Sequence, residues 1–117
     1  MPRYVVLEHA GHGARHWDLM LETGPALATW ALERPPDAGS PVSAKALPDH
    51  RIGYLDYEGP ISGGRGSVTR WDAGQFRLES RSGTELTASL AGGKLVGRIT
   101  LTRSPDAGRW WFVFAPE

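Results

Sequence analysis

The strongest constraint on the fold is a strict alternation of apolar and polar residues between positions 86 and 102. Every second residue is apolar or small in two runs, which are Leu86, Ala88, Leu90 and then Leu95, Gly97, Ile99, Leu101. A period of two is that of a β-strand with one buried face, because successive side chains point to opposite sides. The residues between the runs, 91–94, include two glycines that suit a tight turn. Residues 86–102 therefore predict an antiparallel hairpin.

Similar short runs predict further strands. They fall at residues 4–8, 16–22, 26–32, 67–71, 75–80 and 109–115. No long stretch has helical periodicity. The pattern therefore predicts a mostly β fold: a small closed antiparallel β-barrel of about eight strands with long loops and little helix, since closure removes exposed edges. The aromatic run at 110–114 is apolar on both faces and predicts a strand buried centrally.

Two segments interrupt the strand pattern. Residues 33–48 are rich in proline and predict a long irregular loop with a short helical turn near residues 43–47, because proline cannot donate to a β ladder. The glycine-rich stretch 59–66 has no following lysine and helix, so it does not match a phosphate-binding nucleotide loop.

The 117 residues suit one domain, residues 1–117. The absence of cysteine excludes disulfides and thiolate metal sites. No run approaches the roughly 20 apolar residues that cross a bilayer, and no basic segment precedes a long apolar run. We therefore expect a cytoplasmic protein with no membrane role. Basic and acidic residues number 13 each, so attraction to nucleic acid would need a local patch.

Histidines and an aspartate gather near the amino terminus. On a strand at 16–22, His16 and Asp18 share one face, and His9, at the end of the preceding strand, can reach the same point across a tight loop. Imidazole and carboxylate suit manganese, zinc or iron(II), and three protein ligands leave positions open for water or substrate. His12, within the loop, is an alternative ligand. One histidine alone would more often be a surface polar group, but the cluster favours a metal site.

Short motifs in a fixed order extend this pattern over nearly the whole chain. They are His9, His16-Trp17-Asp18-Leu19, Leu21-Glu22, Trp30, Asp49-His50-Arg51-Ile52-Gly53-Tyr54, Asp56-Tyr57-Glu58-Gly59, Gly66-Ser67-Val68, Trp71-Asp72-Ala73-Gly74 and Lys94-Leu95-Val96-Gly97. As an ordered set they resemble the 3′-phosphoesterase domain of bacterial DNA ligase D, here as a free-standing and divergent homologue.

The resemblance implies a compact β-barrel and a manganese-dependent enzyme of DNA repair that removes a 3′-terminal ribonucleoside and then a 3′-phosphate. It implies that His9, His16 and Asp18 hold Mn2+, with Zn2+ or another transition metal as the alternative, and that His50 and Tyr54 engage the scissile phosphate. The implied partners are DNA or RNA-DNA 3′ ends, and repair proteins such as a separate ligase or polymerase.

The chain departs from the family's pattern at two arginine positions, which here carry Met20 and Val42. We expect phosphate or DNA contacts from nearby basic residues instead, namely Arg15, Lys45, Arg51 and Arg65. The interval between His9 and His16 is also longer than in the family, which keeps His12 open as a ligand.

Two other functions fit the same residues. One is a non-catalytic module that binds a metal and a DNA end through the same barrel. The other is a small metal oxygenase, because two histidines and one carboxylate also form the site of non-haem iron oxygenases.

Overall fold

The computed structural model describes residues 1–37, 39, 41–106 and 108–117; Ala38 and Ser40, within the loop predicted at 33–48, lie outside the described residues. Over these ranges the chain has nine strands and one short 3-10 helix, η1 (Ile52–Asp56). The strands are β1 (Arg3–Ala10), β2 (His16–Glu22), β3 (Ala26–Leu32), β4 (Val42–Arg51), β5 (Gly59–Pro60), β6 (Ser67–Arg81), β7 (Glu85–Gly92), β8 (Val96–Arg103) and β9 (Arg109–Pro116).

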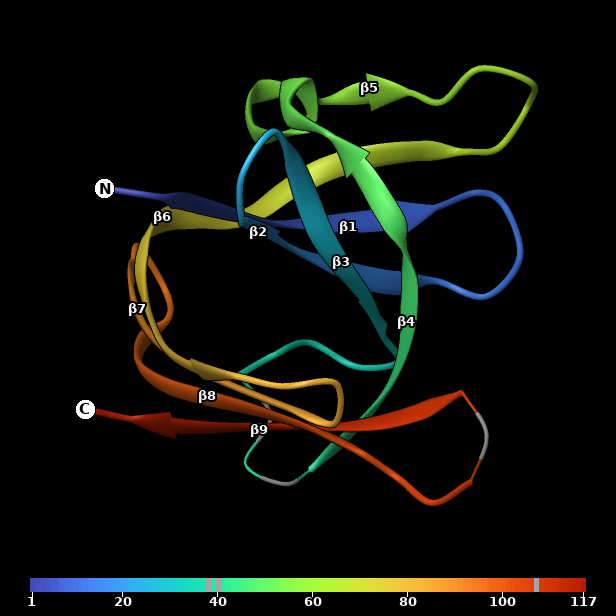
Figure 1. Cartoon of the computed structure of the whole chain (residues 1–117). Coiled ribbons are helices and arrows are strands. Elements are labelled where there is room, and N and C mark those ends of the chain that lie inside the picture. Colours follow the sequence, from blue (N-terminus) through green and yellow to red (C-terminus); the bar gives the residue numbers. More distant parts are fainter. Residues whose placement is uncertain (38, 40, 107) are drawn as a thin grey trace.

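Eight strands form a closed antiparallel ring (Figure 1). Their order is β1-β2-β3-β4-β9-β8-β7-β6, and β6 pairs back with β1. Strand β5 pairs with the start of β6, outside the ring. The predicted mostly β fold and closed barrel of about eight strands are confirmed. The predicted hairpin at 86–102 is also confirmed, as the pair β7–β8.

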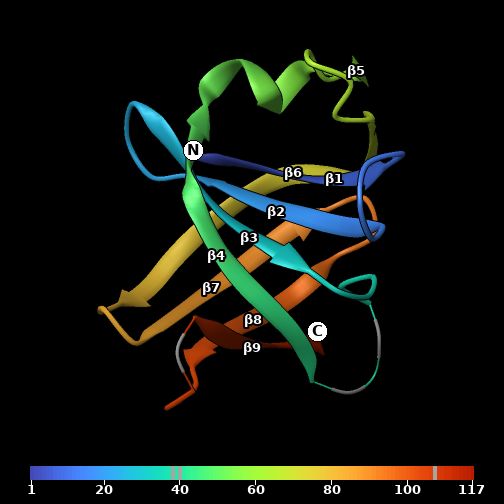
Figure 2. The ribbon, with the colours of Figure 1, turned by 90° about the vertical axis from the view of Figure 1, so that its right-hand side faces the viewer.

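Strand β1 is buried on both faces, which explains its unbroken apolar sequence. Tyr4 and Val6 point into the large cluster enclosed by the ring. Val5 and Leu7 point to the other side, into a second cluster that also contains Leu55 of η1. Residues 50–66, from the end of β4 through η1 and β5 to the start of β6, therefore form a covering segment over the outer side of the β1–β2 wall. Figure 2 shows η1 and β5 as a layer above the ring.

The prediction of an irregular loop at 33–48 is wrong for residues 42–48, because strand β4 begins at Val42. The helical turn predicted near residues 43–47 is wrong for the same reason. Pro48 and Asp49 lie opposite Ala28 in a β-bulge, where the register shifts. Strand β4 pairs with β9 only over its first four residues, 42–45. Proline is tolerated at this bulge, because no regular ladder bond needs its missing N–H.

Strand β6 is continuous, although the sequence predicted two strands at 67–71 and 75–80 separated by a turn. Gly74 is not a turn residue: a Cβ there would lie 2.3 Å from the carbonyl oxygen of Ala91, so glycine lets β7 approach closely. Trp71 is the extra residue of a bulge opposite β1. The bulge lets one long strand pair with β1 over its first half and with β7 over its second.

The central burial predicted for residues 110–114 holds on one face only. Phe112 is fully buried, whereas Trp111 and Val113 are 37% and 43% exposed. Strand β9 has pairing partners on both sides, β4 and β8, but only its inner face packs on the core.

Among the helices of the described residues, none has both the length and the apolar character needed to span a membrane.

Candidate metal centre

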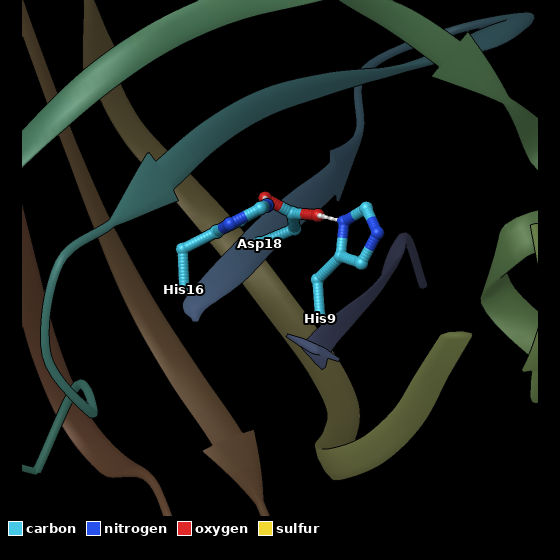
Figure 3. Close-up of side chains that lie close together, drawn as sticks. All are labelled: His9, His16 and Asp18. Atoms are coloured by element: carbon cyan, nitrogen blue, oxygen red, sulfur yellow. Dashed lines mark ion pairs between the residues drawn. The ribbon is translucent and has the colours of Figure 1, made fainter. Parts of the chain in front are cut away.

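Three side chains converge on the outer face of the β1–β2 wall. His9 and His16 are direct partners in the antiparallel ladder, and their ring centroids are 4.6 Å apart. Asp18 follows on the same face of β2. Its Oδ2 lies 3.6 Å from Nδ1 of His9, and its Oδ1 lies 3.2 Å from Nε2 of His16. Figure 3 shows the three groups turned toward one another, and one donor atom from each lies within 4.8 Å of the others.

The alternation of β2 places this carboxylate in an apolar setting. Leu19 and Leu21 fill the interior of the ring, while Met20 joins the outer cluster beside Asp18. Asp18 is only 3% exposed. A buried carboxylate is costly unless a cation or hydrogen-bond donors compensate it. The fold therefore supplies a reason for the two imidazoles beside it.

Each histidine uses its second nitrogen to contact a backbone carbonyl. Nδ1 of His16 lies 3.0 Å from the oxygen of Ala14, and Nε2 of His9 lies 2.6 Å from the oxygen of Arg65. Because a carbonyl only accepts, these nitrogens must carry the proton. In the neutral rings the remaining nitrogens therefore turn a lone pair toward Asp18. Carbonyl partners of this kind commonly orient histidines that bind metals.

The donor set fits a divalent cation. Oδ1 of Asp18 is buried and has no hydrogen-bond partner among the described residues. Two lone pairs and a carboxylate facing one another repel unless a cation or a proton lies between them. Without a metal, a proton on His16 can relieve this repulsion: the pKa of His16 is raised from its ordinary value, chiefly by the neighbouring carboxylate of Asp18, against the opposing effect of burial.

A cavity of about 120 Å3 opens beside these donors. Its far wall comes from the covering segment, where His50 and Tyr54 meet edge to face with ring centroids 5.6 Å apart. Nδ1 of His50 lies 2.9 Å from the oxygen of Pro48, so this ring too is fixed by a carbonyl. Four of the five residues expected at the metal and phosphate, namely His9, Asp18, His50 and Tyr54, thus line one cavity. His16 does not line it but contacts Asp18, which does.

His12 also lines this cavity, but it is not part of the group of three donors. Met20 lines it as well, with no charge to offer a phosphate. Val42 lies elsewhere, fully buried in the cluster enclosed by the ring.

The four expected basic contacts differ in position. Arg65 lines the metal cavity, and Arg51 lines a larger pocket next to it. Arg15 is paired with Glu8 and lies over the ring of Trp17. Lys45 is exposed on β4, in register with β9. Arg65 and Arg51 are therefore the two cations best placed for a ligand in the cavity.

Sequence reasoning missed the backbone groups that hold the histidines. Gly66 has a φ of +80°, and a Cβ on it would lie 2.1 Å from the carbonyl oxygen of Ala10. Glycine at this position lets the covering segment approach β1, which brings the Arg65 carbonyl to His9. The signal in the sequence was the glycine-rich stretch 59–66.

Comparison with known proteins gives a consistent result. The family model described as the DNA ligase D 3′-phosphoesterase domain matches residues 8–103. The multifunctional non-homologous end joining protein LigD of Pseudomonas aeruginosa is 34% identical over 128 residues, covering 98% of this chain. The multifunctional non-homologous end joining DNA repair protein LigD of Mycobacterium tuberculosis is 32% identical over 118 residues, covering 92%. The chain spans 15% of the length of each of these relatives.

Proposed function

Because this chain belongs to the DNA ligase D 3′-phosphoesterase domain family, we propose that it is a metal-dependent phosphoesterase that trims the 3′ ends of DNA during repair. The observation that carries the proposal is the convergence of His9, His16 and Asp18 beside His50 and Tyr54. The proposed substrates are DNA ends that carry a 3′-ribonucleoside or a 3′-phosphate, and the proposed cation is Mn2+.

In this proposal His9, His16 and Asp18 hold the cation. A divalent cation bound there would polarise a phosphoryl oxygen and lower the pKa of a bound water. The chain contributes fixed geometry, because the carbonyls of Ala14 and Arg65 orient the two imidazole rings. The rings therefore lose little conformational freedom when the cation binds.

His50 and Tyr54 would contact the phosphate from the opposite wall. A protonated Nε2 of His50 can donate to a phosphate oxygen or protonate the leaving oxygen, while its Nδ1 stays on the Pro48 carbonyl. For a terminal ribonucleoside, water adds to phosphorus and the bond from phosphorus to the nucleoside's 5′ oxygen breaks. That oxygen takes up a proton, and the DNA keeps a 3′-phosphate.

Met20 stands where the family has an arginine and offers no charge to a phosphate. We propose that Arg65 supplies this cationic contact instead. Its guanidinium group is held by the carbonyl and hydroxyl oxygens of Ser62. The planar donor fork of arginine suits phosphate oxygens.

The direct test offers Mn2+ with a primer-template that ends in a ribonucleotide or a 3′-phosphate. Wild type should release products, whereas H16A and D18A should lose turnover. H12A is the matched control, because His12 lies in the same cavity outside the donor group. Equal rates for wild type, H16A and D18A, or no turnover with any divalent metal, would defeat the proposal.

A second candidate is a non-catalytic module that binds a metal and a DNA end. Met20 favours it, because an apolar side chain occupies the family's arginine position within the cavity. Salt-sensitive binding of DNA ends without product would favour this candidate, since phosphate contacts weaken as salt competes.

A further inference from the structure

We propose that the pocket next to the metal cavity is a nucleobase site, which holds the base of the departing 3′-terminal nucleoside. The inference rests on the proposed function and specifies what the enzyme recognises beyond the phosphate. The pocket has a volume of about 400 Å3 and is lined mainly by the covering segment, including Arg51, Tyr54, Tyr57 and Ile61. That volume is typical of sites for small organic ligands.

The two hollows adjoin each other. Tyr54 and Ile61 line both the metal cavity and the larger pocket. The smaller cavity, about 120 Å3, suits a phosphate group. A nucleoside joined to that phosphate by one ester bond must extend into a neighbouring space, and this pocket shares a wall with the cavity.

The lining suits the face of a base. The rings of Tyr54 and Tyr57 meet edge to face, with centroids 5.8 Å apart and planes at 89°. Tyr57 is 36% exposed, which leaves aromatic surface for a ligand to cover. Bases stack on aromatic side chains with little dependence on sequence, because every base has a π face. Arg51 adds donors for the acceptor atoms of the base or ribose.

The pocket is preformed. The hydroxyl of Tyr57 donates to the carbonyl of Pro60, which fixes the ring. Gly59, at φ +139°, permits this fold-back, since a Cβ there would lie 3.1 Å from the Tyr57 hydroxyl. A ligand that meets an ordered wall loses less entropy in organising it.

Two polar contacts tie the same segment to the barrel. Asp56 pairs with Arg3 at 2.6 Å, and Glu58 accepts the N–H of Arg70 at 2.8 Å. Leu55 of the same segment packs into the outer cluster. The aromatic wall is therefore anchored to β1 and β6, the strands on which His9 and its surroundings lie.

The experiment compares three DNA ends: one with a 3′-ribonucleoside, one with the same ribose lacking its base, and one with a 3′-phosphate alone. Wild type should cleave the base-bearing end with a kcat/KM at least about tenfold above that of the base-free end. Y57A should remove this preference and leave removal of the 3′-phosphate unchanged, because that substrate has no departing nucleoside. Y57F, which keeps the ring, should retain the preference.

W111A is the matched control for loss of an exposed aromatic ring. The exposed fraction of Trp111, 37%, is similar to that of Tyr57. Trp111 lies on β9, however, at the end of the molecule away from β5 (Figure 1). W111A should cleave all three DNA ends with the kcat/KM of the wild type. The inference is overturned if wild type cleaves base-bearing and base-free ends equally. It is also overturned if Y57A slows removal of the 3′-phosphate as much as removal of the ribonucleoside.

A binding measurement separates this inference from the proposed function. If no end is turned over with any metal, the proposed function fails, and fluorescence anisotropy with the Mn2+-loaded protein then tests the pocket alone. Tighter binding of the base-bearing end than of the base-free end, lost in Y57A and kept in W111A, supports the nucleobase site. Equal affinity for both ends overturns it.

Discussion

Nε2 of His16 lies 3.2 Å from Oδ1 of Asp18, a buried carboxylate oxygen that has no hydrogen-bond partner among the described residues. The other nitrogen of the same ring is occupied by the Ala14 carbonyl. The ring is therefore already turned so that a single cation can be shared between imidazole and carboxylate.

The first prediction concerns that shared cation. D18A should weaken binding of Mn2+ more than about 100-fold. Loss of a group that only orients a metal ligand commonly costs about 10–100-fold in affinity, and loss of a ligand itself should cost more. Isothermal titration calorimetry measures this directly. H12A should change the affinity less than about threefold, since His12 lies outside the donor group. A comparable loss in H12A would make His12 a ligand.

The second prediction is the pH dependence of the metal-free protein. The pKa of His16 is raised above its ordinary value of 6.5 in the folded state, chiefly by Asp18. The proton on His16 therefore stabilises the fold fully below that ordinary value, and this stabilisation is lost as the pH rises through the raised pKa. Thermal unfolding across this range should show it, and D18N should abolish it. Affinity for the metal should rise over the same range, because the cation competes with the proton.

The third prediction concerns the approach of the covering segment to β1. G66A should weaken metal binding by about 10–100-fold, because the added Cβ pushes the Arg65 carbonyl away from His9. G64A is the matched control. Gly64 has a similar φ of +68° with nothing near its Cβ, so it reports backbone strain without the collision. Equal effects of the two substitutions on metal affinity would contradict this account.

The fourth prediction tests the interior side of β1. The hydroxyl of Tyr4 donates to Oδ2 of Asp72 at 2.6 Å, and burial together with this bond raises the pKa of Tyr4. Y4F should lower the free energy of unfolding by about 1–3 kcal/mol, because a buried carboxylate loses one donor. Denaturant unfolding measures the loss. Metal affinity should not change, since Tyr4 faces away from the donors; a parallel loss of affinity would show that the two faces of β1 are coupled.

The fifth prediction concerns the phosphate contact assigned to Arg65. R65Q should weaken binding of DNA ends. It should also reduce the slope of the logarithm of the binding constant against the logarithm of the salt concentration by about 1, because each phosphate contact releases counterions. Fluorescence anisotropy at several salt concentrations gives the slope. R103Q removes an exposed arginine from β8, outside the cavity, and should leave the slope unchanged. An unchanged slope in R65Q would exclude Arg65 as a phosphate contact.

The strands of the ring and the face shared by His16 and Asp18 were predictable because both depend on a period of two. The proline-rich stretch before His50 was not. Pro48 argued against a strand, and only the bulge opposite Ala28 explains why β4 tolerates it. Gly74 likewise suggested a turn, whereas it serves a close approach between two strands.

The site shows the same division. The three candidate metal donors lie close together in the sequence, on β2 and at the end of β1, so their convergence could be predicted from spacing alone. The placement of His50 and Tyr54 opposite them depends on a covering segment that returns to β1 from far along the chain. Their role at the site was therefore predicted from the family resemblance and not from spacing. The Arg65 carbonyl is a backbone group, which leaves no trace in side-chain chemistry beyond the glycine that follows it.

The two walls of the cavity have separate origins: the donors stand on the rigid ladder of β1 and β2, and the aromatic residues stand on the layer laid over it. Under the proposed function, substitutions in this one short surface layer would change which DNA ends are accepted and would leave the candidate metal donors in place.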